Sequence, residues 1–118
     1  MSAPGDGLGR GPAPILGDAM NLYAWLHGRF GDDPRRLPGA LCERALGLCD
    51  DLTLALAGRD RPLRLESADE RLVCLRMELR LAAACGLLTD AQVVHAFGFA
   101  ERIGRQLGGW IRAAEGVA

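Results

Sequence analysis

Apolar residues recur every three or four positions along most of the chain, the spacing typical of amphipathic helices. The first run predicts a helix with a core face of Ile15, Ala19, Leu22, Tyr23, Leu26 and Phe30. Gly31 is expected to end this helix, and Asp32, Asp33 and Pro34 should form a turn. Asp33 suits the N-cap of the next helix, with Pro34 at its first position. Because Pro38 would clash one turn later, a start near Pro38 is the alternative.

Three further periodic stretches predict the remaining helices. The second helix should end at Gly58 and has a core face of Leu41, Ala45, Leu48, Leu52 and Leu56. The capping box Ser67–Glu70 predicts that a third helix starts at Ala68 and runs to Gly86. Its expected core face is Leu72, Leu75, Leu79, Ala82 and Ala83. A second capping box, Thr89–Gln92, predicts a fourth helix with a core face of Val93, Phe97, Ala100, Gly104, Leu107 and Ile111.

The pattern of the whole chain is typical of an all-α protein. It contains no strand-like alternation and no Asn-Gly or Asp-Gly hairpin turn. Four helices with short connections predict an up-down-up-down four-helix bundle over residues 15–113. Residues 1–14, rich in Gly and Pro, are expected to form a flexible tail, and residues 114–118 a frayed C-terminus.

The fourth helix has two unusual features. Gly104 and Gly108 lie on one side, which favours close packing by a neighbouring helix; the alternative is that Gly108 and Gly109 end the helix early. A second apolar strip is offset from the core face and would be partly exposed in a lone bundle. This strip predicts a homo-oligomer with an interface formed by Phe99, Ile103 and Trp110.

Composition narrows the class of protein. The 118 residues fit one domain, with 49% hydrophobic and 25% charged residues, as in ordinary globular proteins. No apolar run approaches the ~18–20 residues that span a bilayer, and no secretory signal is evident. The cysteines form no CxxC pair and are expected to be reduced in a cytoplasmic protein: Cys42, Cys49, Cys74 and Cys85.

No motif points to catalysis, a metal or a cofactor. His27 and His95 fall on different predicted helices, outside any HExxH-type pattern. Cys42 and Cys49 share a helix face, but no base is placed to activate them. The glycines near the N-terminus lack the strand that precedes a phosphate-binding loop. An enzyme with a site built only by oligomerisation is therefore the least favoured hypothesis.

The charges are unevenly distributed. All 14 basic residues are Arg, and the formal net charge is −1. Residues 1–70 carry a surplus of acids, whereas residues 71–118 carry a surplus of Arg, so an anionic partner should meet the second half. Arg76 and Arg80 stack on one helix face, and no acid lies three or four positions from either of them. A salt bridge to another helix or subunit and an anionic or protein partner both remain open for this pair.

The C-terminal run Glu101-Arg-Ile-Gly-Arg-Gln-Leu-Gly-Gly-Trp110-Ile resembles the ending of the accessory variability determinant (Avd) family. These are small accessory proteins of diversity-generating retroelements. Three other pieces are similar to the family in the same order: residues 16–30, the segment Leu41-Cys-Glu-Arg44, and residues 68–89. The resemblance covers about residues 15–113.

The resemblance implies a four-helix bundle related to the proteins encoded in ribosomal-RNA intervening sequences. It implies a homopentameric barrel that is not an enzyme, needs no cofactor and does not act at a membrane. The expected partners are the retroelement's reverse transcriptase and template-repeat RNA or other nucleic acid, in support of mutagenic retrohoming. The family's basic positions match Arg44, Arg76, Arg80, Arg102 and Arg105.

One departure from the family bears on nucleic-acid binding. Family members are often clearly basic, whereas this chain has a net charge of −1. Affinity for nucleic acid depends on clustered positive charge, so direct RNA binding should be weak unless oligomerisation gathers the Arg residues into a ring. The alternative hypothesis is an interaction protein of the intervening-sequence type without a reverse-transcriptase partner.

Overall fold

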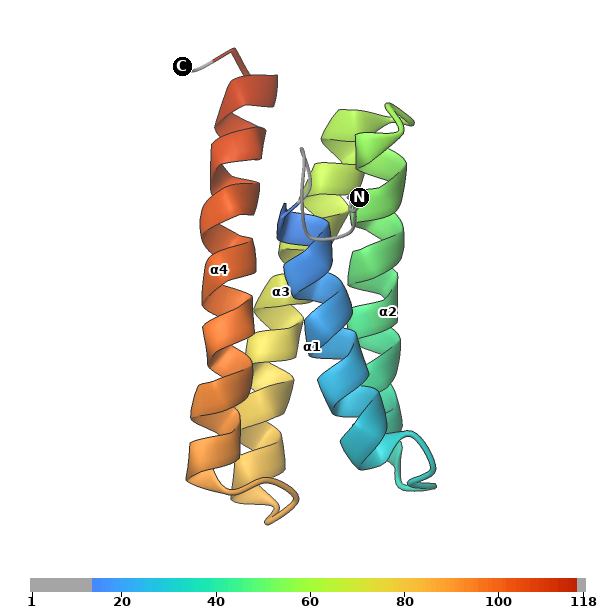
Figure 1. Cartoon of the computed structure of the whole chain (residues 1–118), viewed down its shortest axis with the longest axis vertical. Helices are drawn as coiled ribbons and strands as arrows, with labels where there is room; N and C mark the ends of the chain where they lie inside the picture. Colours follow the sequence, from blue (N-terminus) through green and yellow to red (C-terminus); the bar gives the residue numbers. More distant parts are fainter. Residues whose placement is uncertain (1–13, 117–118) are drawn as a thin grey trace, which may run out of the picture.

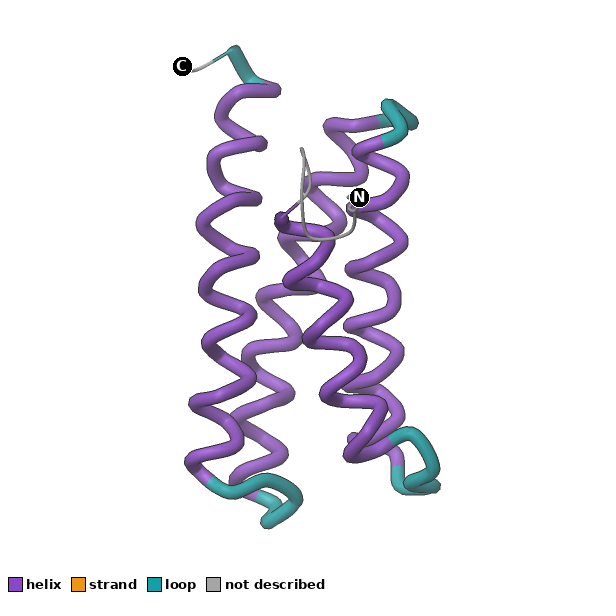
Figure 2. The backbone as a smooth tube through the Cα atoms, in the orientation of Figure 1, coloured by secondary structure: helices purple, strands orange, loops and turns teal. Residues whose placement is uncertain are grey.

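The computed structural model describes residues 14–116, which form four antiparallel helices in chain order. They are α1 (Pro14–Phe30), α2 (Arg36–Leu56), α3 (Arg61–Ala84) and α4 (Asp90–Ala114). Each helix packs against two neighbours: α2 lies between α1 and α3, and α4 lies between α3 and α1 (Figure 1). Short loops join consecutive helices (Figure 2). The predicted up-down bundle is confirmed.

The core runs along the bundle axis and consists of aliphatic side chains from all four helices. Its largest fully buried members are Ile15, Leu22, Leu26, Leu41, Leu48, Leu52, Leu65, Leu72, Leu75, Leu79, Ile103 and Leu107. Burial of such side chains contributes about 1.5–3 kcal/mol each, which makes this core the main source of stability. Across residues 14–116, no helix is long and apolar enough to cross a membrane.

The start of α2 fits the predicted alternative near Pro38 and not a start at Pro34. The helix begins at Arg36, between Pro34 and Pro38, and Pro38 is accepted in its first turn, where no backbone N–H bond is lost. Asp33 is not the N-cap; its carboxylate instead accepts hydrogen bonds from the backbone N–H and guanidinium of Arg35. These bonds lower the pKa of Asp33 to about 2.

The predicted start of α3 at Ala68 is wrong, because the helix begins two turns earlier at Arg61. Asp60 precedes it with a left-handed backbone (φ 50°), and Pro62 occupies the first turn, where proline is well tolerated. Ser67 is therefore not a capping residue but an interior one. Its hydroxyl donates to Asp51 of α2 at 2.6 Å, a partner that the local capping pattern does not reveal.

Helix α4 begins as predicted, and its core face includes the predicted Ala100 and Leu107 but is rotated away from the other predicted positions. The capping box is present, with Thr89 and Gln92 bonded reciprocally. The buried residues are Ala96, Ala100, Ile103 and Leu107. The predicted face was centred too far toward α3, where Phe97, Gly104 and Ile111 are only partly buried.

The chain termini were expected to be unstructured. Pro14 belongs to α1, and the rest of the predicted N-terminal tail lies outside the described residues. At the other end α4 continues through Gly108 and Gly109 to Ala114, with Glu115 as its C-cap, so these glycines do not end the helix. Residues 117–118 also lie outside the described range.

Candidate arginine interface on helix α3

Helix α3 carries arginines on two edges, one facing α2 and the other facing α4. Arg64 and Arg71 reach toward α2, whereas Arg76 and Arg80 reach toward α4. The two edges differ in what they offer a guanidinium group. That difference separates arginines that hold the bundle together from arginines available to a partner.

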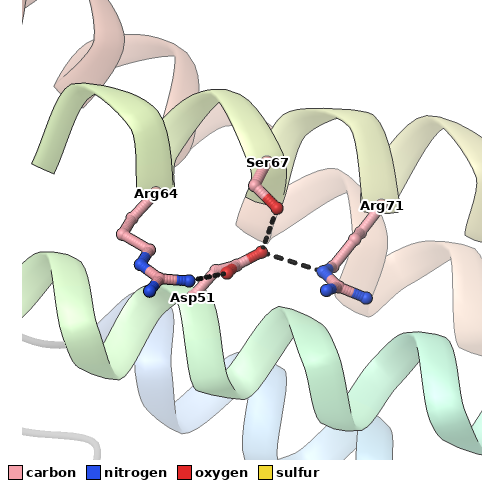
Figure 3. Close-up of polar contacts among 4 residues, drawn as sticks. All are labelled: Asp51, Arg64, Ser67 and Arg71. Atoms are coloured by element: carbon pink, nitrogen blue, oxygen red, sulfur yellow. Dashed lines mark hydrogen bonds and ion pairs between the residues drawn. The ribbon is translucent and has the colours of Figure 1, made fainter. Parts of the chain in front are cut away.

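The edge toward α2 is organised by the buried carboxylate of Asp51, which is 1% exposed. It accepts hydrogen bonds from Ser67 Oγ at 2.6 Å and Arg71 Nε at 2.8 Å, and Arg64 Nη1 lies at 3.4 Å (Figure 3). A buried carboxylate is costly unless it is paired and hydrogen-bonded. Three donors from one helix meet that need, so this cluster joins α3 to α2.

Gly47 makes room for this cluster. It lies one turn before Asp51 on α2, and a Cβ atom there would overlap the guanidinium of Arg71. Glycine in a helix interior costs about 1 kcal/mol relative to alanine. The close approach of Arg71 gives a physical reason for that cost.

Arg44 and Glu78 continue the same α2–α3 contact toward the other end of the bundle. Arg44 Nη2 donates to Glu78 Oε2 at 2.8 Å, and Glu78 is only 6% exposed. This bond raises the pKa of Arg44 above its ordinary value. Arg44, expected from the resemblance to contact a partner, is thus engaged with a carboxylate of its own subunit.

The edge toward α4 provides no carboxylate for Arg76 or Arg80 within residues 14–116. Arg76 Nη2 donates to the backbone oxygen of Ala100 at 3.4 Å, a long hydrogen bond. The guanidinium of Arg80 lies 5.1 Å from the centre of the Phe97 ring, in cation–π contact. Their positive charges are therefore not neutralised by an ion pair among the described residues.

Gly104 lies directly beside Arg76. A Cβ at Gly104 would come within 2.7 Å of Arg76 Nη2 and 3.5 Å of Leu72 Cδ2. At Gly104 the space that a Cβ would take is thus occupied by an arginine side chain of α3. At Gly108 the nearest atom to such a Cβ is Arg112 Nη1 of the same helix, at 3.6 Å, so the expected interhelical packing is not found there.

The two remaining candidate arginines lie on α4. Arg102 Nε lies 3.4 Å from Asp18 Oδ1 of α1, and its guanidinium is 5.0 Å from the Phe99 ring centre. Arg105 lies 3.8 Å from Glu101 in an exposed pair, which contributes little to stability. Arg102 therefore helps to join α4 to α1, whereas Arg105 remains largely exposed.

The three residues expected to form an oligomer interface do not share one surface. Ile103 is fully buried in the bundle core, because the core face of α4 is centred near it, so its side chain cannot contact another subunit. Phe99 and Trp110 are half-buried against the same core. Phe99 also stands edge-on to His95 at 5.3 Å, and Trp110 lies 6.0 Å from the guanidinium of Arg61.

The cysteines and histidines are not assembled into a metal or nucleophilic site in the described part of the chain. No group of three metal-ligating side chains is present within residues 14–116, and all four cysteines are free. Burial raises the pKa of Cys42, and it raises that of Cys49 from 9.0 to about 11. A raised pKa makes a thiol a poor nucleophile at neutral pH.

Two features on or beside α3 are not among the predicted site residues. The Asp51 cluster had one signal in the sequence, an acid placed among the apolar positions Leu48 and Leu52. The second feature is an exposed apolar strip formed by Val73, Met77 and Leu81. Its signal was the helical spacing of four, on the side opposite the predicted core face.

Comparison of the chain with protein-family models, with curated proteins and with solved structures found no match. The fold therefore defines a four-helix all-α domain and no narrower class.

Proposed function

We propose that this chain is a non-catalytic accessory subunit of a diversity-generating retroelement. In this role it binds the reverse transcriptase and template RNA and supports mutagenic retrohoming. The observation that carries the proposal is the run Ile103-Gly-Arg-Gln-Leu-Gly-Gly-Trp110, which resembles the Avd family and lies within the last helix of a four-helix bundle.

The contacts of Gly104 support the proposal because they connect this run to α3. Gly104 is the glycine beside which Arg76 is seated, and Arg80 lies one turn further along α3. Both arginines lack a carboxylate partner within residues 14–116, so a partner's phosphate or carboxylate would meet little competition. Arginine binds such groups through its planar fork.

The proposed mechanism is to hold enzyme and template together. A homopentameric ring would repeat Arg76 and Arg80 around its surface, with Arg105 as a further exposed contact. Because Arg44 and Arg102 are engaged with Glu78 and Asp18, they contribute less to this surface than the resemblance implies. Association between the ring and nucleic acid should weaken as salt is added.

The direct test is to sequence the few kilobases of DNA that flank the gene. The proposal expects a reverse-transcriptase reading frame and two near-identical repeats that differ mainly at adenines of the template copy. Absence of both would overturn it.

The second candidate is an interaction protein of the intervening-sequence type, with the same bundle and no reverse-transcriptase partner. The net charge of −1 and the pairing of Arg44, Arg64 and Arg71 with acids favour this candidate, because they leave few cations for nucleic acid. It becomes the leading proposal if the flanking DNA lacks both the enzyme gene and the repeats.

A further inference from the structure

The seam between α1 and α4 carries a row of three aromatic rings. The Trp25 ring of α1 lies 5.5 Å from the His95 ring of α4, and His95 stands edge-on to Phe99 at 5.3 Å. His95, the middle ring, is exposed, whereas Trp25 and Phe99 are half-buried. The row therefore places aromatic surface at the solvent-facing edge of two packed helices.

An arginine lies against each end of this aromatic row. The guanidinium of Arg29 is 5.7 Å from the centre of the Trp25 ring, and that of Arg102 is 5.0 Å from the centre of the Phe99 ring. Planar guanidinium groups stack on aromatic rings and still offer N–H donors to an anion. The row thus combines flat faces with a positive charge at each end.

The side chains around the rings leave room for a flat ligand. A Cβ at Gly28, three positions after Trp25, would meet nothing within 4 Å. At Gly98, three positions after His95, it would meet only Arg102 Nη1, at 3.8 Å. The other residues three and four positions from these two rings include no large exposed hydrophobic side chain: Asn21, Leu22, Arg29, Ala91, Gln92 and Phe99.

The acids near the row do not reverse its positive charge. No acid lies three or four positions from any of the three rings. Across the seam, Asp18 is already bonded to Arg102 at 3.4 Å. Two acids follow Arg29 in the loop at residues 32–33, but neither forms an ion pair with it within residues 14–116. The row therefore favours an anionic ligand.

Unpaired nucleic-acid bases fit this row better than other ligand classes do. A cation would meet two guanidinium groups, and an aliphatic segment would find no large exposed hydrophobic residue beside the rings. An acidic peptide would use the arginines and leave the ring faces without a partner. Unpaired bases stack on aromatic and guanidinium faces while their phosphates bind arginine, whereas the bases of a duplex are already stacked on one another.

We infer that Trp25, His95 and Phe99, with Arg29 and Arg102, form a stacking site for unpaired bases of a single-stranded nucleic acid. The bases stack on the rings, and the phosphates between them accept hydrogen bonds from the guanidinium groups. This inference goes beyond the proposed function, because the site is separate from the arginine edge of α3 and needs no reverse transcriptase.

The two tryptophans of the chain give a direct optical test. Trp110→Phe leaves Trp25 as the only tryptophan, and Trp25→Phe leaves Trp110, which lies outside the seam beside Arg61. Each variant is titrated with an unstructured oligouridine of about twelve nucleotides. Saturable quenching of the emission is expected for Trp110→Phe, because a base stacks on Trp25, and little change for Trp25→Phe. Equal quenching of both variants, or of neither, would overturn the inference.

A pair of histidine variants measures what the row contributes to affinity. His95→Ala removes the middle ring. His27→Ala is the matched control, because His27 is also exposed on a helix and lies 5.7 Å from an aromatic ring, that of Tyr23. Fluorescence anisotropy of the labelled strand should show about tenfold weaker binding by His95→Ala and unchanged binding by His27→Ala. Equal affinities of the two variants would contradict a stacking role for the row.

Three competitors identify what the site binds: a duplex of the same strand, inorganic polyphosphate and oligoglutamate of similar length. At matched charge, each should displace the single strand at least tenfold less well than an unlabelled copy of that strand. Equal displacement by the duplex or by polyphosphate would show that charge alone is bound, and equal displacement by oligoglutamate would assign the seam to a protein partner. Either result overturns the inference. Because no reverse transcriptase is used, neither result bears on the proposed function, which the flanking DNA tests.

Discussion

The two edges of α3 use the same residue type in opposite ways. Toward α2, Arg64 and Arg71 hold a carboxylate that is almost fully buried. Toward α4, Arg76 and Arg80 meet a backbone oxygen and an aromatic ring, neither of which neutralises a charge. The comparison shows that the position of an arginine on a helix does not determine its role. The group supplied by the neighbouring helix does.

The largest expected effect comes from removing the carboxylate of the α2 edge. Asp51→Asn should lower the free energy of unfolding by about 3 kcal/mol, because it leaves Arg64 and Arg71 without the charge they surround. Urea denaturation measures the change. Asp50→Asn is the matched control, since Asp50 is exposed on the adjacent position and should change stability by less than ~0.5 kcal/mol. Equal effects of the two would remove the distinction between the edges.

The glycines beside each edge should respond with opposite signs. Gly47→Ala should destabilise by about 1 kcal/mol, because displacing Arg71 from Asp51 costs more than the helix propensity gained. Gly104→Ala should be neutral or stabilising by up to ~1 kcal/mol, since Arg76 can move into solvent and loses only a long hydrogen bond. Thermal unfolding of both is compared with Gly109→Ala, where a new Cβ meets nothing within 4 Å and should stabilise. If Gly47→Ala instead raised the stability of the protein, the bond between Arg71 and Asp51 would not contribute as proposed.

A smaller effect, separate from the two edges of α3, concerns the pH dependence of stability at Cys49 of α2. Desolvation, followed by the nearby charge of Asp50, raises the pKa of Cys49 from 9.0 to about 11. The neutral thiol is thus favoured in the fold, so its contribution to stability is complete below pH 9 and is lost as pH rises toward 11. The loss should be no more than about 1 kcal/mol, because partial exposure screens it. Stability measured from pH 8 to 11 should fall less steeply in Cys49→Ala; identical slopes would refute the assignment.

The sequence predicted the bundle because each helix keeps a helical period over several turns. It also predicted the Thr89 capping box, whose two bonds join residues three apart and so depend only on local sequence. The start of α3 was missed because Ser67 and Glu70 form a capping pattern inside a helix. Ser67 does not cap a helix, because its hydroxyl donates a hydrogen bond to Asp51, which lies 16 residues away in the sequence.

The candidate site was predicted only in part, for a similar reason. That Arg76 and Arg80 have no acid three or four positions away could be predicted from the sequence of one helix. Within residues 14–116, the other helices provide no ion-pair partner for them either. The burial of Ile103 could not be predicted from residue size, because the core face of α4 is lined by the small residues Ala96 and Ala100. These alanines shift the buried face away from the larger Phe97 and Ile111.

The account is tested most directly by two double variants that remove the same charge from the two edges of α3. Urea unfolding and reverse-transcriptase binding are measured for Arg64→Ala with Arg71→Ala, and for Arg76→Ala with Arg80→Ala. The first should lose about 3 kcal/mol of stability and, where folded, bind the enzyme as the wild type does. The second should unfold within ~0.5 kcal/mol of the wild type and lose most of its binding. A second variant that unfolds, or that binds undiminished, would contradict the division of roles between the two edges.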